Sequence, residues 1–216
     1  MMFPYDAVIL IARKKFAVES SMVHPLLFHI ALVAALLPPT TTTSAQSCPC
    51  NTSSNYALLM DFYTTTTGWI TIQGWGNTSM PICSWYSDIR CSSQDIVTIE
   101  VSNNNISGTL PVSWANLTQL RKLFLHDNSL TGTLPPQWSS MTLMGNLYLA
   151  RNSLTGTLPP SWSSMSLLSF VDLSSNSLTG TLHSSWSSMS QLSYVDLNSN
   201  SLTGTLPPSW SNMTEP

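Results

Sequence analysis

Few residues in this sequence have the types and spacing that catalytic or metal chemistry requires. The chain contains four histidines, and only His126 and His183 lie beyond the first 45 residues. Neither belongs to an H-E-x-x-H or comparable metal-binding spacing, and no G-x-S-x-G, Walker or G-x-G-x-x-G pattern occurs. A lone histidine is more often an ordinary surface residue than a catalyst. We therefore expect no catalytic residue, no metal and no cofactor, and a protein that is not an enzyme.

The cysteines are the other reactive side chains, and all four lie in one stretch. Cys48, Cys50, Cys83 and Cys91 follow an apparent export signal. An even number of cysteines in an exported chain favours disulfides. Zinc would need C-x-x-C pairs or histidines at ligand spacing, which "CPC" and a lone C-x₇-C do not supply. Cys48 and Cys50 would form a strained bridge with each other, so their pairing stays open.

The N-terminal region has the features of that export signal. A basic cluster at 13–15 precedes an apolar run at 26–37, and "TTTTSAQS" offers a cleavage site after Ala45. The run is shorter than the roughly 20 apolar residues that span a bilayer. We expect residues 1–45 to be a signal-peptide region, with translation starting at Met22. The mature protein is then secreted or at the cell surface, and reaches a membrane only through its signal or through an anchor outside this chain.

Composition excludes one class of partner and argues against disorder. Charged residues make up 8% of the chain, where about a quarter is usual, and the formal net charge is −3. Without a basic patch we expect no nucleic-acid partner. A hydrophobic share of 43% with eight tryptophans is typical of a folded chain.

A unit of 24 residues recurs five times and defines the architecture. It reads L-x-x-L-x-L-x-x-N-x-L-x-G-x-L-P-P-x-W-x-x-M, and the tryptophan column shows the period: Trp114, Trp138, Trp162, Trp186 and Trp210. In L-x-L, alternate side chains point inward from a short strand, the Asn can bond backbone groups at the bend, and Trp and Met bury the back of the turn. A single copy cannot bury its apolar face, so the copies must stack.

The unit is that of the leucine-rich repeat, and "L-x-G-x-[IL]-P" resembles its plant type. "LPPSWSSM" resembles the promastigote surface antigen family of kinetoplastids, "NYALLMDFYTTTTGW" resembles the capping helix of such proteins, and "CSWYSDIRC" resembles their cap signature. The resemblance implies an α/β solenoid, a horseshoe of about five repeats with a parallel β concave face and an N-terminal capping helix. It also implies a Cys83–Cys91 disulfide and a role in adhesion or recognition. We expect a cap at 46–95 and repeats at 96–216, the last incomplete, with a different bend where His183 and Ser184 replace Pro-Pro.

The outward strand positions vary while the core letters stay fixed, which favours a binding face for a protein or glycan ligand. Aromatic and arginine residues supply most binding hot spots. Aromatic side chains form a diagonal across this face, although Phe and Tyr also favour strands for packing reasons. The tryptophan column could bind sugars, but it occupies the slot of a buried aliphatic residue, so we expect it in the core. The candidate ligand-binding residues are Arg121, Lys122, Phe124, His126, Tyr148, Arg151, Phe170, Asp172, Tyr194 and Asp196.

Five N-x-[ST] sequons offer glycosylation sites in an exported chain. Loop and turn settings favour two of them most, Asn77 and Asn116. The full set is Asn51, Asn77, Asn105, Asn116 and Asn212.

Two rival functions stay open from the sequence. The chain could be the ectodomain of a receptor-like kinase or a secreted hydrolase inhibitor of the plant type, or it could be a coat protein with no specific ligand. The last repeat stops at "SNMTEP", where a following strand would begin. We therefore expect an uncovered end, and a chain cut short of its full length.

Overall fold

The computed structural model describes residues 8–9, 50–68, 75–76, 79–82, 85 and 89–212. Cys48, Cys83, Asn77 and the expected signal region other than 8–9 lie outside the described residues, as does the side chain of Asn212. Within the described part of the chain, no helix has the length and apolar character needed to cross a membrane.

An N-terminal cap begins the fold. Helix α1 (Ser53–Thr65) starts at Thr52, whose Oγ1 accepts a hydrogen bond from the Asn55 backbone N–H at 3.2 Å. The helix buries Phe62 against the ring of Trp114 in the first repeat, with centroids 4.8 Å apart. An antiparallel pair of strands follows, β2 (Ile89–Ser92) and β3 (Asp95–Glu100). The predicted capping helix is confirmed.

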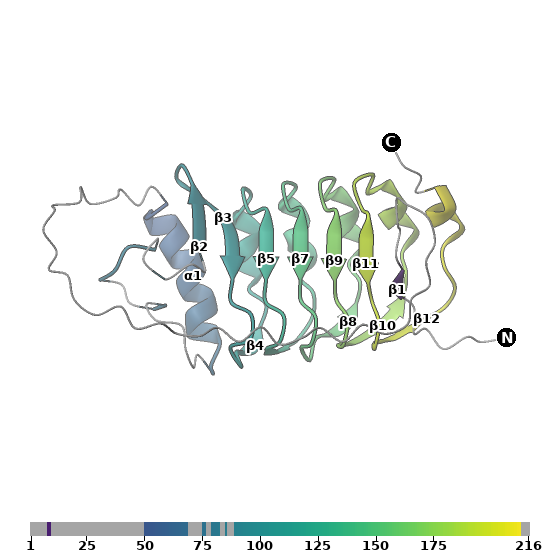
Figure 1. Ribbon diagram of the computed structural model, residues 1–216, viewed down its shortest axis with the longest axis horizontal. Coiled ribbons are helices and arrows are strands. Elements are labelled where there is room, and N and C mark those ends of the chain that lie inside the picture. The colour runs from purple at the N-terminus through teal and green to yellow at the C-terminus, as the bar shows by residue number, and fades with distance from the viewer. Residues whose placement is uncertain are drawn as a thin grey trace, which may run out of the picture.

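A sheet of short strands runs along the solenoid, one strand for each repeat (Figure 1). From β3 onward its repeat strands are parallel and in register, so equivalent residues of successive repeats lie side by side. The sheet order is β1-β11-β9-β7-β5-β3-β2, where β1 is Val8–Ile9. The further strands are β5 (Lys122–Phe124), β7 (Asn146–Tyr148), β9 (Phe170–Asp172) and β11 (Tyr194–Asp196).

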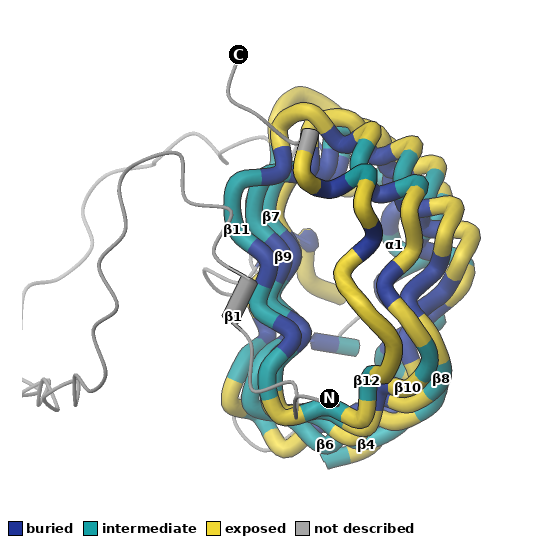
Figure 2. Tube along the Cα trace, turned by 90° about the vertical axis from the view of Figure 1, so that its right-hand side faces the viewer, coloured by how far each residue is buried: buried dark blue, intermediate teal, exposed yellow. Residues whose placement is uncertain are grey.

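A second set of parallel strands (Figure 2) and a row of 3₁₀ helices complete each coil. The second strands pair as β4–β6 and as β8–β10–β12, and an isolated Thr133–Thr155 bridge joins the two groups. Their bounds are β4 (Ser107–Thr109), β6 (Ser129–Thr131), β8 (Thr155–Thr157), β10 (Ser177–Thr181) and β12 (Ser201–Thr203). The helices are η3 (Val112–Asn116), η4 (Pro136–Ser140), η5 (Pro160–Ser164), η6 (Ser184–Ser188) and η7 (Pro208–Asn212). The predicted repeat solenoid is confirmed.

The tryptophans form a buried stack along the core. Trp138 and Trp162 are fully buried with nearly parallel rings, 6.3 Å apart and at 6°. From the second repeat onward each indole also donates a hydrogen bond to the preceding repeat, as Trp162 Nε1 does to the Pro135 carbonyl at 3.0 Å, while Trp114 Nε1 donates to the Leu58 carbonyl of α1. The expectation that this column is core rather than a sugar-binding rail is confirmed.

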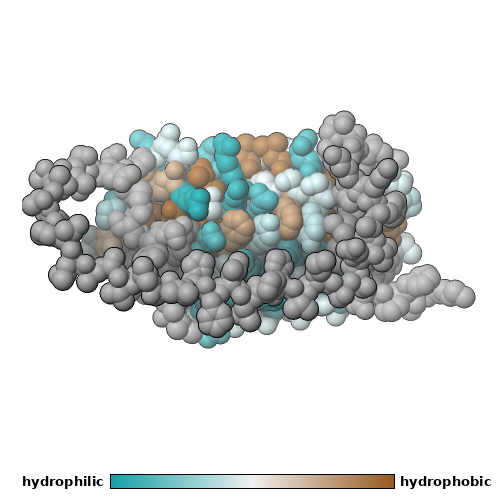
Figure 3. Space-filling view, in the orientation of Figure 1, coloured by the Kyte–Doolittle hydropathy of each residue, from teal (hydrophilic) through white to brown (hydrophobic). Residues whose placement is uncertain are grey.

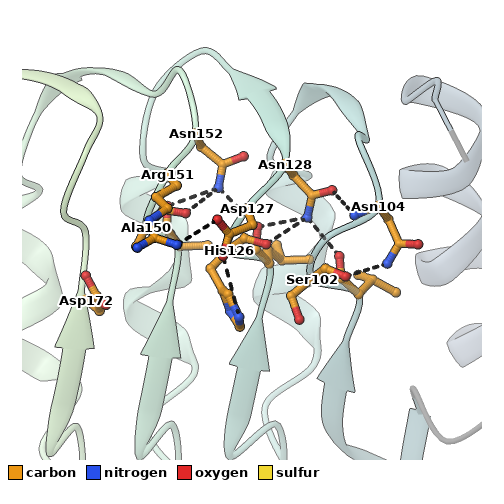
Figure 4. A network of polar contacts seen from close by, with 12 residues as sticks. Ser102, Asn104, His126, Asp127, Asn128, Ala150, Arg151, Asn152 and Asp172 are labelled. Atoms are coloured by element: carbon orange, nitrogen blue, oxygen red, sulfur yellow. Dashed lines mark hydrogen bonds and ion pairs between the residues drawn. The ribbon is translucent and has the colours of Figure 1, made fainter. Parts of the chain in front are cut away.

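The asparagine column satisfies the backbone at the bend after each strand (Figure 4). Asn152 Oδ1 accepts from the Leu130 N–H at 3.0 Å, and Asn152 Nδ2 donates to the carbonyls of Leu125 and Leu149 at 3.0 Å each. One side chain thereby satisfies groups of two adjacent repeats that a turning backbone would leave unpaired. The predicted role of the Asn is confirmed.

The cap disulfide differs from the expected one. Cys91 pairs with Cys50, with Cα atoms 5.8 Å apart, so the expected Cys83–Cys91 pairing is wrong. The pairing follows from the position of α1, because Asn55 Nδ2 donates to the carbonyls of both Cys50 (3.0 Å) and Gln94 (2.8 Å). These bonds hold the start of the helix against the β2–β3 turn, which follows Cys91 of β2.

The expected different bend at His183 and Ser184 is also wrong. Residues Ser184–Ser188 form the same 3₁₀ helix as the other repeats, and the His183 backbone (φ −91°, ψ 134°) is extended like that of the prolines it replaces. The His183 ring nitrogen accepts from the Ser185 N–H at 3.2 Å. This side-chain cap compensates for the lost rigidity of proline.

The far edge of the strand sheet is not bare. Strand β1 (Val8–Ile9) lies antiparallel to β11, with Val8 opposite Asp196 and Ile9 opposite Val195. The uncovered end that the sequence predicts is the final half-repeat rather than β11, and Leu206 in that half-repeat is 49% exposed, so the pairing of β1 does not contradict the prediction. Cleavage after Ala45 would remove β1 and leave the edge of β11 unpaired.

Candidate functional site

The outward side of β3, β5, β7, β9 and β11, called the strand face here, brings variable residues into ordered rows. In register, Phe124 lies beside Tyr148 and Tyr148 beside Asp172, while the inward Leu123, Leu147 and Val171 are fully buried. Figure 3 shows hydrophobic and hydrophilic residues next to one another on the uncovered part of this face. The predicted inward and outward positions are therefore correct on these strands.

Four aromatic rings on the strand face form a continuous stack, the aromatic ladder. Ring centroids are 4.7 Å apart for Phe124–Tyr148, 4.4 Å for Tyr148–Phe170 and 4.1 Å for Phe170–Tyr194. The ladder changes column between Tyr148 and Phe170, because Phe170 is in register with Asn146. Asp172 and Asp196 occupy the column that the ladder leaves. Since each ring covers the faces of its neighbours, the ladder presents mainly ring edges to solvent.

A hollow of about 600 Å³ lies beside the ladder. It exists because small residues, Ala150 and Ser174, stand at a position that His126 and Asn198 fill on the flanking repeats. Ala150 is 7% exposed and forms part of the floor. The lining residues are Glu100, Phe124, His126, Asp127, Tyr148, Ala150, Arg151, Asp172, Ser174 and Asp196.

The rim of the hollow is held by an ion pair between two repeats (Figure 4). Arg151 Nη1 lies 3.2 Å from Asp127 Oδ1, and His126 Nε2 lies 4.0 Å from the other oxygen of Asp127. Asp127 (φ 55°) and Arg151 (φ 52°) both adopt the left-handed backbone conformation at the same point of the repeat. The ion pair therefore engages one nitrogen of the single guanidinium of the lining, and the Arg151 side chain stays 71% exposed.

The two aspartates at the other side of the hollow are oriented by neutral donors. Asp172 Oδ1 accepts from the Ser174 N–H at 3.0 Å and from its hydroxyl at 2.7 Å. Asp196 Oδ1 accepts from the Asn198 N–H at 3.0 Å, and the Tyr194 hydroxyl lies 3.4 Å from Asp196 Oδ2. Among the described residues, neither aspartate has an ion-pair partner.

The pKa values of both ladder tyrosines are raised, by burial and by these aspartates. Burial raises the pKa of Tyr194 to about 12, helped by the negative charges of Asp196 and Asp172. Burial, followed by the charge of Asp172, also raises the pKa of Tyr148. In both tyrosines burial is the larger cause, and the carboxylates of β9 and β11 add to it.

The structure brings most of the ten predicted binding residues together but not all. Lys122 and Arg121 are exposed on and before β5, and neither lines the hollow. Sequence reasoning missed the hollow itself, whose only signal is the small side chain of Ala150 and of Ser174 between bulkier neighbours. The residues placed in the hollow or the ladder are Phe124, His126, Tyr148, Arg151, Phe170, Asp172, Tyr194 and Asp196.

Other predicted sites lie away from this face or are not tested. Asn51, Asn105 and Asn116 are exposed, which leaves their glycosylation a prediction. In the part of the chain that the structure describes, no group of three or more His, Cys, Asp or Glu side chains could hold a metal ion.

Solved structures similar to this chain include ectodomains of plant receptors. The BIR2 ectodomain from Arabidopsis thaliana is 24% identical with a TM-score of 0.66, covering 73% of this chain and 85% of that one. The BIR3–SERK2 complex from Arabidopsis thaliana is 23% identical with a TM-score of 0.62, covering 70% of this chain and 85% of that one. The Arabidopsis receptor kinase HAESA was solved with the peptide hormone IDA and the co-receptor SERK1. It is 25% identical with a TM-score of 0.68, and the match covers 74% of this chain but only 28% of that one. No match is found among curated proteins.

The family follows from the repeats. The profile of the Leucine Rich Repeat family matches residues 95–117, 119–141, 146–165, 167–189 and 191–213, which together make up just over half of the chain. Each matched segment holds one strand of the strand sheet and one 3₁₀ helix. The chain therefore belongs to the leucine-rich-repeat family.

Proposed function

We propose that this protein is exported and acts by recognition rather than catalysis, binding an extracellular protein or glycan through its strand face. The observation that carries the proposal is the aromatic ladder beside a hollow of about 600 Å³. Rings such as Tyr148 and Phe170 are only half-buried. Half-buried aromatic side chains next to a depression are typical of binding hot spots.

The similar structures support a protein or peptide over a glycan as the ligand. HAESA was solved with a peptide hormone and a protein co-receptor, and BIR3 with SERK2. A receptor-kinase ectodomain stays the second candidate, because these neighbours include receptor kinases. In either case the part described here would act through binding.

Export and a surface location are part of the same proposal. The Cys50–Cys91 disulfide fits an oxidising compartment outside the cytosol. The "LPPSWSSM" unit is similar to that of the promastigote surface antigen type, which favours adhesion or contact with another cell. Secretion of the full chain by a eukaryotic host, with cleavage after Ala45 found by N-terminal sequencing, is the expected result. A retained N-terminus would contradict it.

A binding array tests the recognition function. The full chain, produced in a secretory host, is applied to an array of extracellular proteins and glycans. We expect a specific signal that Tyr148→Ala/Phe170→Ala abolishes. The matched control, Thr155→Ala/Thr179→Ala, changes two exposed residues of the second strand set and should retain the signal. A signal that survives the ladder variant, or no signal from the wild type, would overturn the proposal.

A further inference from the structure

We propose that the hollow seats the basic side chain of a lysine or arginine in an extended segment of the ligand, with neighbouring apolar side chains along the aromatic ladder. This inference rests on the proposed function and specifies its ligand as a basic peptide segment. Three independent features of the hollow support it: its charge, its prepared acceptors and its shape.

The charge of the lining selects a cation. Four carboxylates border the hollow, Glu100, Asp127, Asp172 and Asp196, against the one guanidinium of Arg151. That guanidinium is already engaged by Asp127 at 3.2 Å. An anionic ligand group would therefore meet three further carboxylates against one guanidinium that already contacts Asp127, whereas a cation would be attracted.

The acceptors are oriented before any ligand arrives. The N–H and hydroxyl of Ser174 both bind Asp172 Oδ1, which fixes the carboxylate while its other oxygen accepts no hydrogen bond from the described residues. One repeat later the Asn198 N–H binds Asp196 Oδ1, and the Tyr194 hydroxyl lies 3.4 Å from Asp196 Oδ2. Because successive strands lie about 4.8 Å apart, the two carboxylates are spaced to share one ammonium or guanidinium group.

The shape suits a side chain with an apolar stem and a charged end. Ala150 and the ring of Tyr148 give an apolar floor and wall, and the aspartates stand at the far side. Lysine and arginine bury their methylene stems along such surfaces while the charged end stays among polar groups. Ring stacking covers the faces of Tyr148, so attraction comes from the carboxylates rather than from a cation held over that ring.

The test is a selection of random linear peptides displayed on phage, with the full chain as the target. The seat variant is Asp172→Gln/Asp196→Asn. Gln is used at position 172 because Asp172→Asn would create a glycosylation acceptor with Ser174. The matched control is Asp95→Asn, which removes an exposed carboxylate at the start of β3, outside the hollow. Thermal unfolding of each variant checks its fold, and the single variants replace the double one if that is unstable.

We expect peptides selected by the wild type and by Asp95→Asn to be enriched in Lys or Arg beside an apolar residue. Replacing that Lys by norleucine should weaken binding about tenfold or more, and the seat variant should lose this preference. Peptides without basic residues that still need Tyr148 would overturn the cation seat but leave the proposed function standing. Peptides indifferent to both Tyr148→Ala and the seat variant, or no selective recovery, would also overturn the cation seat, whereas the proposed function fails only if the array gives no signal that depends on the ladder.

Discussion

The two sets of parallel strands come from the same repeat, yet only one of them repeats its outward residues. In the second set, T-G-T recurs and so do its contacts: Thr155 Oγ1 donates to the Gly132 carbonyl at 3.2 Å, and Thr179 Oγ1 to that of Gly156 at 3.3 Å. On the strand face the equivalent positions change from Lys122 to Asn146 to Phe170.

This difference distinguishes the positions whose residue type is constrained by stacking of the repeats from the positions that are free to vary. A residue that contacts the same atoms in every repeat is constrained to one type, as in the Thr, Gly, Asn and Trp columns. An outward residue of the strand face has no such contact with the core, so its identity can serve a ligand. The following predictions test this separation, from the largest expected effect to the smallest.

Removal of one core tryptophan should be the most damaging change. Trp162 is fully buried between Trp138 and Trp186, with ring centroids 6.3 and 6.2 Å away. We expect Trp162→Ala to lower the free energy of unfolding by about 3–5 kcal/mol, measured by urea denaturation. A loss below about 1 kcal/mol would show that the stack is not needed for stability.

The glycine of T-G-T should tolerate no side chain. Gly156 has φ +80°, and a Cβ there would lie 2.8 Å from Thr133 Cγ2. We expect Gly156→Ala to cost about 1–3 kcal/mol, with partial recovery when Thr133→Ser removes that methyl group. Gly145 is the control, because its Cβ would meet nothing nearer than the Arg121 carbonyl at 3.6 Å. Equal losses at both glycines would refute the constraint.

Replacing an outward residue at the end of a strand should destabilise the protein less than replacing the inward residue that follows it. Tyr148 ends β7 on the strand face, and Leu149 follows it with a fully buried side chain. We expect Leu149→Ala to cost about 2–5 kcal/mol and Tyr148→Ala only about 1 kcal/mol, the stacking in the ladder. Chemical denaturation of the two variants compares them directly. If both unfold the protein equally, the strand face is part of the core.

The smallest expected effect is a shift in tyrosine ionisation. With its pKa raised to about 12 from 10, Tyr194 stays neutral in the folded protein while an unfolded chain ionises. Its contribution to stability is therefore complete below pH 10 and is lost as the pH rises from about 10 through 12. The ultraviolet difference titration between wild type and Tyr194→Phe reports this ionisation. Asp196→Asn should lower the midpoint; an unchanged midpoint would exclude a role for that charge.

The sequence could predict the features that recur in every repeat, but few of the features that occur only once. The columns through Trp162 and Asn152 recur five times, so stacking assigns their burial and bonding without a structure. The cap has no repeat to set its register, and the family resemblance predicts the wrong partner for Cys91, which pairs with Cys50. The hollow arises from the absence of bulk at Ala150 and Ser174, which becomes visible only when neighbouring strands are aligned in space.

A glycan placed on each strand set gives the most direct test of recognition by the strand face. Asp172→Asn creates an N-x-S acceptor with Ser174 on the strand face, and Thr155→Asn creates an N-x-T acceptor with Thr157 on the second set. Both are made in the secretory host, their occupancy is checked by mass, and binding to the array is measured. The account predicts that the glycan at position 172 abolishes binding and the one at 155 does not. Binding that survives at 172, or is lost only at 155, would contradict it.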